Sequence, residues 1–252
     1  MGTVTVREGF EVDWRSTPAN AAAAIPGPRA FAAVGVRKWL DAALASEWAS
    51  AVLRARSDWT SDFDGEQFTL GRAFYTHYET DRSDEYFEHA AESDARVERC
   101  LPGMQARMRE LVSTVTGRAS HARRDWCGPG VHVFPHGGEV AGRGGVVHFD
   151  TEGLSDRHAR DKRPALTIVV MLQEPEEGGG LKLWDVRFRG RDDPTEEELA
   201  KDAVVARYGV GGVLVIDSYR LHQIQPFTGD RDRISITVHA AEVDDGVWET
   251  WF

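Results

Sequence analysis

Between Trp126 and His239 short apolar and β-branched runs alternate with turns, several of which are rich in glycine. Runs of this length and composition are typical of β-strands. Before Trp126 the apolar residues recur three and four positions apart, as they do on one face of a helix. Because helical and strand-like segments occupy separate halves, we expect an α+β fold. Strands are expected at residues 131–134, 146–150, 164–172, 181–184, 213–216, 221–224 and 234–239.

The N-terminal half is expected to be mainly helical. Helices are predicted at residues 36–56 and 83–116, the second interrupted at Pro102-Gly103 and closed by Gly117. Further expectations are a short helix or coil at residues 21–24 ended by prolines, a polar loop at 57–71, and an aromatic strand at 72–78. With no repeat or linker visible, we expect one domain over residues 1–252, made of a helical support region (1–125), a strand core (126–240) and a C-terminal tail (241–252).

Composition excludes several classes of function. The 252 residues are 41% hydrophobic and 28% charged, as in an ordinary globular protein with a sizeable core. A net charge of −11 disfavours binding to nucleic acid or to anionic lipid. The two cysteines form no disulfide framework and the N-terminus carries no secretory signal, so we expect a cytoplasmic protein. No apolar run is long enough to span a membrane.

The run His148-Phe149-Asp150 carries the first chemical signal. Residues separated by one position on an extended chain point to the same side, so an imidazole and a carboxylate would meet there. His222 follows after several further strand-like runs. Two histidines and one carboxylate on one face of a metal form the facial triad of non-haem Fe(II) oxygenases. Neither the H-x-D tripeptide nor His222 alone is strong evidence for a metal site. H-x-D also occurs in surface loops, and a lone histidine is more often a packed side chain.

Arg233 and Ser235 add a second signal. They share one face of a predicted strand with Thr237 and His239, while isoleucine and valine occupy the other. A surface ion pair with the adjacent Asp230 or Asp232 is one interpretation. If both faces of the strand are covered, however, an inward arginine needs an anionic partner, and a bound keto-acid carboxylate would satisfy it.

Taken together, residues 126–240 resemble the Fe(II)/2-oxoglutarate-dependent oxygenases, in particular the prolyl-4-hydroxylase-like branch. The resemblance rests on residues 131–138, His148-Phe149-Asp150, residues 166–172 with Glu177-Gly178-Gly179, residues 211–217 before His222, and Arg233 with Ser235. It implies a double-stranded β-helix, or jelly-roll, core with the N-terminal helices packed on one sheet.

The same resemblance implies a dioxygenase that uses Fe(II), 2-oxoglutarate and O₂ and releases succinate and CO₂. His148, Asp150 and His222 would bind the metal and act in catalysis. Arg233 and Ser235 would bind the far carboxylate of 2-oxoglutarate, with His132 and Thr167 as further contacts. This branch often carries a tyrosine near position 134, and Phe134 lacks that hydroxyl. The contact is therefore absent or comes from elsewhere, and His132, on the same strand face, is one source.

The substrate is the least constrained part of the prediction. Aromatic and polar residues that could line the mouth of the site are Arg72, Tyr75, His77, Trp126, Arg143 and Trp184. We expect hydroxylation of a small polar metabolite, such as a free amino acid or a natural-product intermediate, because no peptide-docking module is visible. The charged segment 152–163 after the first two ligands is interpreted as a lid.

Three alternatives stay open. The chain could be a non-catalytic metal-binding jelly roll, or a metalloenzyme that uses the triad without 2-oxoglutarate. It could also use the same cofactors for desaturation or cyclisation. The sequence does not indicate an oligomeric state.

Overall fold

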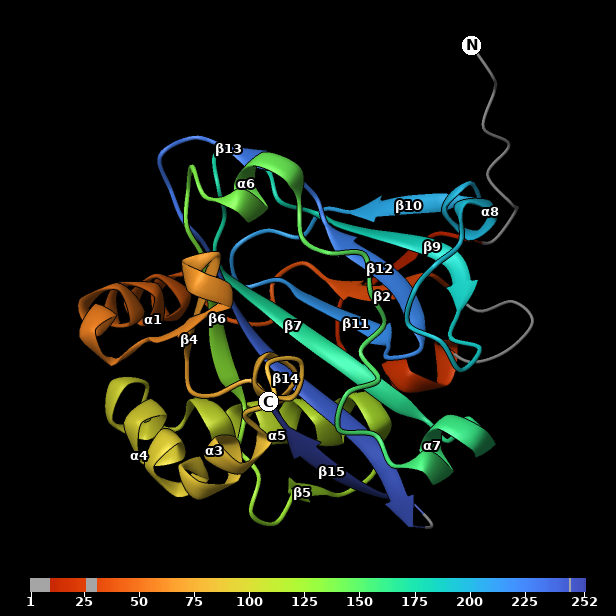
Figure 1. The fold of residues 1–252 in the computed structure, drawn as a ribbon, viewed down its shortest axis with the longest axis horizontal. Coiled ribbons are helices and arrows are strands. Elements are labelled where there is room, and N and C mark those ends of the chain that lie inside the picture. Colours follow the sequence, from red (N-terminus) through yellow and green to blue (C-terminus); the bar gives the residue numbers. More distant parts are fainter. Residues whose placement is uncertain (1–9, 26–30, 245) are drawn as a thin grey trace.

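The computed structural model describes residues 10–25, 31–244 and 246–252 (Figure 1). Its largest element is a mixed sheet in which the strands follow the order β1-β2-β11-β7-β14-β6-β4-β3, with β15 beside β14 and β5 beside β15. The strands are β1 (Val12–Arg15), β2 (Ala33–Val36), β3 (Thr60–Asp62), β4 (Gln67–Leu70), β5 (Ser120–Ala122), β6 (Gly130–Phe134), β7 (Ala165–Gln173), β11 (Val213–Asp217), β14 (Arg233–Asp244) and β15 (Val247–Trp251).

A smaller sheet of order β10-β9-β12 lies against the large one. Its strands are β9 (Leu181–Arg187), β10 (Ala203–Ala206) and β12 (Arg220–Ile224), and a short pair joins β8 (Glu177–Gly178) to β13 (Phe227–Thr228). Met171, Leu183 and Leu214 belong to one buried cluster that fills the space between the two sheets. This arrangement confirms the predicted α+β class and the jelly-roll core.

The helices are α1 (Ala42–Arg54), α2 (Phe74–Tyr78), α3 (Ser83–Glu88), α4 (Ala90–Cys100), α5 (Met104–Thr116), α6 (Glu139–Arg143), α7 (Asp156–Asp161) and α8 (Glu196–Leu199). Three of them, α1, α4 and α5, cover the outer face of the large sheet. Residues of α1, α4 and α5 share the main hydrophobic core with the sheet. In Figure 1 these three helices lie to the left and below, and β9 and β10 lie to the upper right.

Alternate side chains of β14 face the hydrophobic core on one side of the strand and a cavity on the other. Ile234, Ile236 and Val238 pack in the helix-facing core. Arg233, Ser235, Thr237 and His239 face the interior between the two sheets and line a cavity there. The alternation predicted for this strand is therefore confirmed, and it places four polar groups inside the β-sandwich.

Several element predictions were right. β6, β7, β9, β11 and β12 fall where strands were expected, and a 3₁₀ helix occupies Ala21–Ala24. The second helical region breaks at Pro102-Gly103 and closes at Gly117, whose φ of 67° suits a residue without a Cβ. The prolines expected to end the 3₁₀ helix lie outside the described residues.

Other predictions were wrong. Residues 72–78 are not a strand: Phe74–Tyr78 is a single helical turn, too short to display helical periodicity. The polar loop 57–71 contains β3 and β4, and the first helix begins at Ala42, where Asp41 caps it by accepting hydrogen bonds from the Ala43 and Leu44 amides. Residues 146–150 are extended but make only one bridge, between His148 and His222.

The regions outside the core also differ from expectation. The segment expected to be a tail contains the end of β14 and all of β15, paired with each other. The region expected to be mainly helical contributes five strands, β1 to β5, to the large sheet. Among the described helices, none is both long and apolar enough to cross a bilayer.

Candidate metal centre and adjoining cavity

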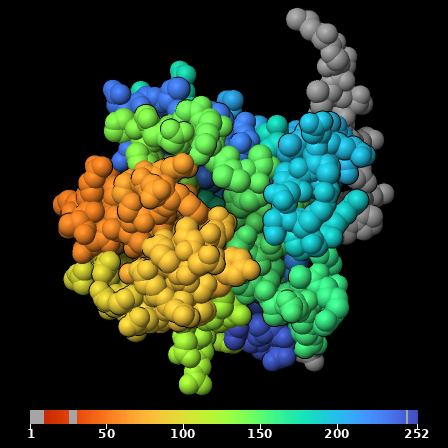
Figure 2. All heavy atoms as spheres, viewed as in Figure 1, coloured from red at the N-terminus to blue at the C-terminus, as the bar shows by residue number. Residues whose placement is uncertain are grey.

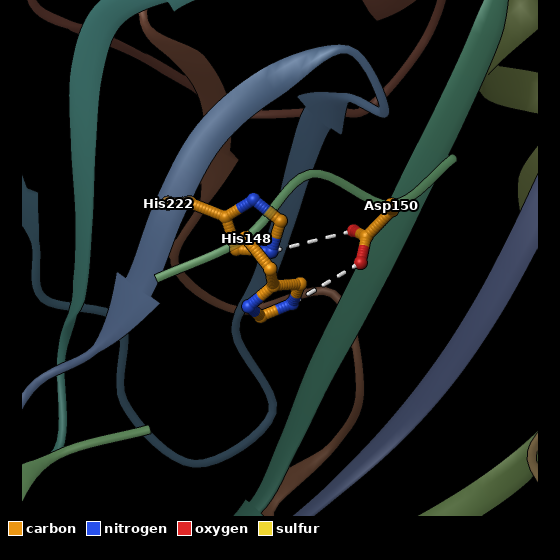
Figure 3. A group of neighbouring side chains, drawn as sticks. All are labelled: His148, Asp150 and His222. Atoms are coloured by element: carbon orange, nitrogen blue, oxygen red, sulfur yellow. Dashed lines mark ion pairs between the residues drawn. The ribbon is translucent and has the colours of Figure 1, made fainter. Parts of the chain in front are cut away.

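His148, Asp150 and His222 converge beside β12 of the smaller sheet (Figure 3). The backbone of His148 meets that of His222 directly, through N–H···O bonds of 3.1 and 3.0 Å in the two directions. This bridge sets the two imidazole rings side by side, with centroids 4.3 Å apart. The Asp150 amide donates to the Ser218 carbonyl at 2.9 Å, which fixes the third side chain.

The donor atoms of the three side chains point toward one another (Figure 3). His148 Nε2 lies 3.3 Å from Asp150 Oδ1, and His222 Nε2 lies 3.4 Å from Asp150 Oδ2. One donor atom from each residue falls within 4.8 Å of the others. Two nitrogens and one oxygen are thus gathered around one point, as a facial metal site requires.

Backbone carbonyls orient both imidazoles. His148 Nδ1 lies 2.8 Å from the Val146 carbonyl oxygen, and His222 Nδ1 lies 2.9 Å from the Arg220 carbonyl oxygen. Because a carbonyl oxygen only accepts, each Nδ1 must donate its N–H. In a neutral ring the lone pair would therefore sit on Nε2, facing Asp150, and this is the tautomer that a metal ligand needs. Burial lowers the pKa of His148, but Asp150 outweighs this effect and raises it to about 9, so a metal would displace a proton from this ring.

The electrostatics of the cluster suit a cation. Burial would raise the pKa of Asp150, but the adjacent His222 and His148 hold it below its usual range, so the carboxylate is ionised. Burial lowers the pKa of His222 to about 4 despite the attraction of Asp150, so its imidazole is neutral at pH 7. Asp150 Oδ2 is buried and accepts no hydrogen bond. A divalent metal fits this donor set and would satisfy that oxygen.

Arg233 lies deep in the same interior, with only 1% of its surface exposed. Its Nε donates to the Gly179 carbonyl at 3.0 Å, one terminal nitrogen donates to Ser235 Oγ at 3.1 Å, and the other donates to the Tyr208 hydroxyl at 2.8 Å. In the described parts of the chain no carboxylate lies within ion-pair distance of this guanidinium. A buried cation held only by neutral groups calls for an anion from outside the chain.

A cavity of about 320 Å³ connects Arg233 with the three converging side chains. Figure 2 shows the face where the orange segment (residues 63–79) meets the green segment (residues 140–152) across a hollow. The residues around the cavity are Phe63, Glu66, Gln67, Tyr75, Glu79, His132, Phe134, Val140, Arg143, Gly144, Gly145, Val146, His148, Asp150, Glu152, Thr167, Val169, Leu181, Tyr208, Ile216, His222, Ile224, Arg233, Ser235, Thr237 and His239.

His132 and Thr167, two of the predicted cosubstrate contacts, line this cavity. Burial lowers the pKa of His132 to about 3, so its ring is neutral, and its Nδ1 has no hydrogen-bond partner. Thr167 Oγ1 lies 3.1 Å from Nδ1 of His239 and 3.2 Å from Oγ of Ser218. Both residues are thus placed to contact a small molecule in the cavity.

The structure divides the predicted substrate residues into two groups. Tyr75 and Arg143 line the cavity. Arg72 and His77 do not, because they bond to each other at 2.9 Å, and Arg72 also pairs with Glu85 at 2.8 Å. Trp184 packs in a separate core and donates to the Leu199 carbonyl. Trp126 belongs to an aromatic cluster around Phe74 and Tyr86, outside the cavity.

Sequence reasoning missed several polar residues of the cavity, among them Tyr208, Glu79 and Glu152. Tyr208 precedes a glycine-rich turn, Glu79 follows α2, and Glu152 follows the first two converging side chains. Burial, reinforced by Asp150, raises the pKa of Glu152 to about 7. Only Glu152 had a sequence signal, its closeness to Asp150.

The segment 152–163 is anchored and does not form an open lid. It contains α7, whose His158 is buried with Nε2 3.0 Å from the Glu242 carbonyl oxygen. The Tyr219 hydroxyl donates to the His158 carbonyl at 2.9 Å. Of this segment only Glu152 reaches the cavity, which argues against the lid interpretation.

No family model and no curated protein matches this sequence. Solved structures do match. SnoN, an epimerase of nogalamycin biosynthesis in complex with Fe³⁺, alpha ketoglutarate and nogalamycin RO, aligns with a TM-score of 0.57 at 15% identity over 88% of this chain and 85% of that one. An N-substituted L-amino acid dioxygenase from Burkholderia ambifaria AMMD aligns with a TM-score of 0.52 at 12% identity, over 84% and 91%.

An oxidoreductase of the 2OG-Fe(II) oxygenase family from Burkholderia pseudomallei aligns with a TM-score of 0.50 at 14% identity, over 90% of this chain and 92% of that one. At these identities the likeness shows a common fold. The chain has the double-stranded β-helix fold found in iron- and 2-oxoglutarate-dependent oxygenases, as its sequence motifs predicted.

Proposed function

We propose that this protein is an Fe(II)- and 2-oxoglutarate-dependent dioxygenase. The observation that carries the proposal is the joining, in one cavity, of a cluster of two histidines and an aspartate with a buried arginine that lacks an acidic partner. A metal alone would explain His148, Asp150 and His222, but only an anionic cosubstrate explains Arg233 as well.

In this proposal each residue has a defined role. His148, Asp150 and His222 bind Fe(II). Arg233 and Ser235 bind the far carboxylate of 2-oxoglutarate, with His132 and Thr167 as further cavity contacts. The bound iron supplies the oxidising chemistry with O₂, and 2-oxoglutarate leaves as succinate and CO₂. The chain holds the reactants in a cavity bounded on one side by apolar residues such as Val169 and Ile216, which exclude water.

The substrate class that we propose is a small polar metabolite, a free amino acid or a natural-product intermediate. Tyr75, Arg143, Glu79 and Glu152 surround the part of the cavity available to it, and they offer both charges and an aromatic face. Such a mixed lining suits a zwitterionic or amphipathic molecule. SnoN and the amino acid dioxygenase, which share the fold, are described with small-molecule substrates. Residues 1–252 would act as one domain in the cytoplasm.

Hydroxylation is the proposed outcome. Asp150 occupies the position that would have to be vacant for chloride to bind the metal, and its backbone amide is anchored to the Ser218 carbonyl, which keeps this ligand at the site. Desaturation and cyclisation are distinguished by product mass under labelled O₂. Hydroxylation adds one labelled oxygen, while the other two outcomes remove two hydrogens. Epimerisation leaves the mass unchanged.

The test is an anaerobic titration of the protein with Fe(II) and then 2-oxoglutarate. We expect a weak visible charge-transfer band near ~500 nm on adding the second ligand. We also expect Arg233→Ala to weaken 2-oxoglutarate binding by about tenfold or more, because a charge-assisted bidentate contact is lost. Metal binding without 2-oxoglutarate binding would indicate a non-catalytic metal protein or a different metalloenzyme, and would contradict the proposal.

A further inference from the structure

Tyr208 lines the cavity, and its hydroxyl lies beside the guanidinium of Arg233. Resting on the function proposed above, we propose that Tyr208 is a cosubstrate-binding residue whose hydroxyl donates a hydrogen bond to the far carboxylate of 2-oxoglutarate. In this chain it would supply the phenolic contact that Phe134 cannot make. The residue lies outside every motif that pointed to the cosubstrate.

The donor inventory around Arg233 supports the assignment. A guanidinium has five N–H donors, and Arg233 uses one each on Gly179, Ser235 and Tyr208. The Tyr208 hydroxyl accepts from Arg233, so its own hydrogen is left to donate. Within the described residues that hydroxyl makes no second hydrogen bond. The remaining donors of Arg233, the Ser235 hydroxyl and the Tyr208 hydroxyl therefore surround a place for one carboxylate.

Tyr208 is also held firmly enough to select a ligand. Ala206, two residues earlier, pairs with Leu181 at the end of β10. On the other side, the Val210 amide donates to the Glu174 carboxylate at 3.0 Å and the Gly211 amide donates to the Met171 carbonyl at 2.8 Å. The connection from β10 to β11 is thus tied to the smaller sheet before Tyr208 and to the large sheet after it. A rigidly placed donor adds affinity because little motion is lost when the ligand binds.

The Tyr208 hydroxyl is in the protonation state that a hydrogen-bond donor needs. Burial raises the pKa of the Tyr208 phenol, and the lowering effect of Arg233 does not overcome it. The hydroxyl therefore keeps its hydrogen at neutral pH. A phenolate at this place would form an ion pair with Arg233 and compete with a carboxylate. A neutral phenol leaves the positive charge of Arg233 available to the ligand.

The first experiment measures ligand affinity, without turnover, in the metal-loaded protein under anaerobic conditions. Tyr208→Phe removes only the hydroxyl and keeps the ring in its buried cluster. We expect it to weaken 2-oxoglutarate binding by about tenfold, as for the loss of a hydrogen bond to a charged group. Binding of 2-oxobutyrate, which lacks the far carboxylate, should be unchanged. Equal loss for both ligands would show a merely structural role and overturn the inference.

Tyr219→Phe is the matched control. It also removes one buried hydroxyl, but that hydroxyl bonds to the His158 carbonyl away from the cavity. We expect its 2-oxoglutarate affinity to equal that of the unaltered protein. If the unaltered protein binds 2-oxoglutarate and Tyr208→Phe binds it equally well, only the inference fails. If the unaltered protein does not bind 2-oxoglutarate at all, the proposed function fails together with the inference.

A second experiment separates direct contact from the positioning of Arg233. The Tyr208→Phe change is repeated in an Arg233→Ala background, with 2-oxoglutarate raised to millimolar concentration. Direct contact predicts that the second change still weakens binding several-fold. If Tyr208 only positions Arg233, the change has no effect once that side chain is gone. If Tyr208→Phe leaves 2-oxoglutarate affinity unchanged in this background, the inference is overturned.

Discussion

At the scale of single residues, Asp150 supplies the negative charge of the proposed metal centre. Its carboxylate lies within 3.4 Å of both imidazoles, and its Oδ2 lacks a hydrogen bond. Asp150→Asn keeps the shape but removes the charge and one anionic ligand. We expect Fe(II) affinity to fall by about 100-fold or more, since even changes to residues that only orient metal ligands cost 10–100-fold.

The measurement is an anaerobic Fe(II) titration, repeated with Co(II). Asp192→Asn is the matched control, because Asp192 is exposed and bonds to Thr151 close to the cluster. It should bind metal as the unaltered protein does. An Asp150→Asn variant with metal affinity within threefold of normal would remove this residue from the ligand set.

His132 should make the free energy of unfolding depend on pH. Burial lowers its folded-state pKa to about 3, whereas an unfolded histidine titrates near its ordinary value of 6.5. The unfolded chain therefore binds a proton that the folded chain excludes, so this residue favours unfolding as pH falls below about 6.5. We expect the free energy of unfolding to drop by about 1 kcal/mol per pH unit between pH 6 and pH 4 from this residue. His132→Gln should show a shallower slope in urea unfolding over that range, and identical slopes would contradict the assignment.

At the scale of elements, β14 performs two separate tasks with its two faces. Ile236 packs among the helices, and Ser235 holds Arg233 on the cavity side. Ile236→Ala should lower the free energy of unfolding by about 2–5 kcal/mol, because it leaves a void in a packed core. Its affinity for 2-oxoglutarate should hardly change.

Ser235→Ala should show the opposite pattern, with weaker cosubstrate binding and a small change in stability. Urea unfolding and ligand titration on both variants check the pair. If Ile236→Ala weakened binding as much as Ser235→Ala does, the two faces would not be independent.

Elements were predictable from sequence where burial imposes a pattern. β7 is covered on both faces, so it is apolar except for Thr167 and Gln173, and β14 alternates between core and cavity. β3 and β4 were missed because short strands near a sheet edge carry mostly polar residues. The helix Phe74–Tyr78 was missed because one turn has no period to detect.

At the scale of the molecule, the convergence of His148, Asp150 and His222 was predictable because their spacing matches a known arrangement, whereas the lining of the cavity was not. Tyr208 reaches Arg233 only because the β10–β11 connection folds back over the large sheet. No local sequence pattern predicts such a contact. Likewise Arg72 and Trp184 have the right chemistry for a binding site, but their partners, Glu85 and the Leu199 carbonyl, lie elsewhere.

The proposed site joins segments that are distant in the sequence, so it exists only in the folded chain. His148 comes from an extended segment, His222 from β12 and Arg233 from β14. A ligand that binds only the folded state stabilises it by about 2.7 kcal/mol at 100 times its dissociation constant. For a chain of this size we expect 2-oxoglutarate with Mn(II) to raise the melting temperature by about 5–10 °C. Arg233→Ala should cut the part due to 2-oxoglutarate to about half or less and keep the part due to Mn(II), whereas His222→Ala should lose both. A melting temperature that responds to neither ligand in the unaltered protein would contradict the proposed site as a whole.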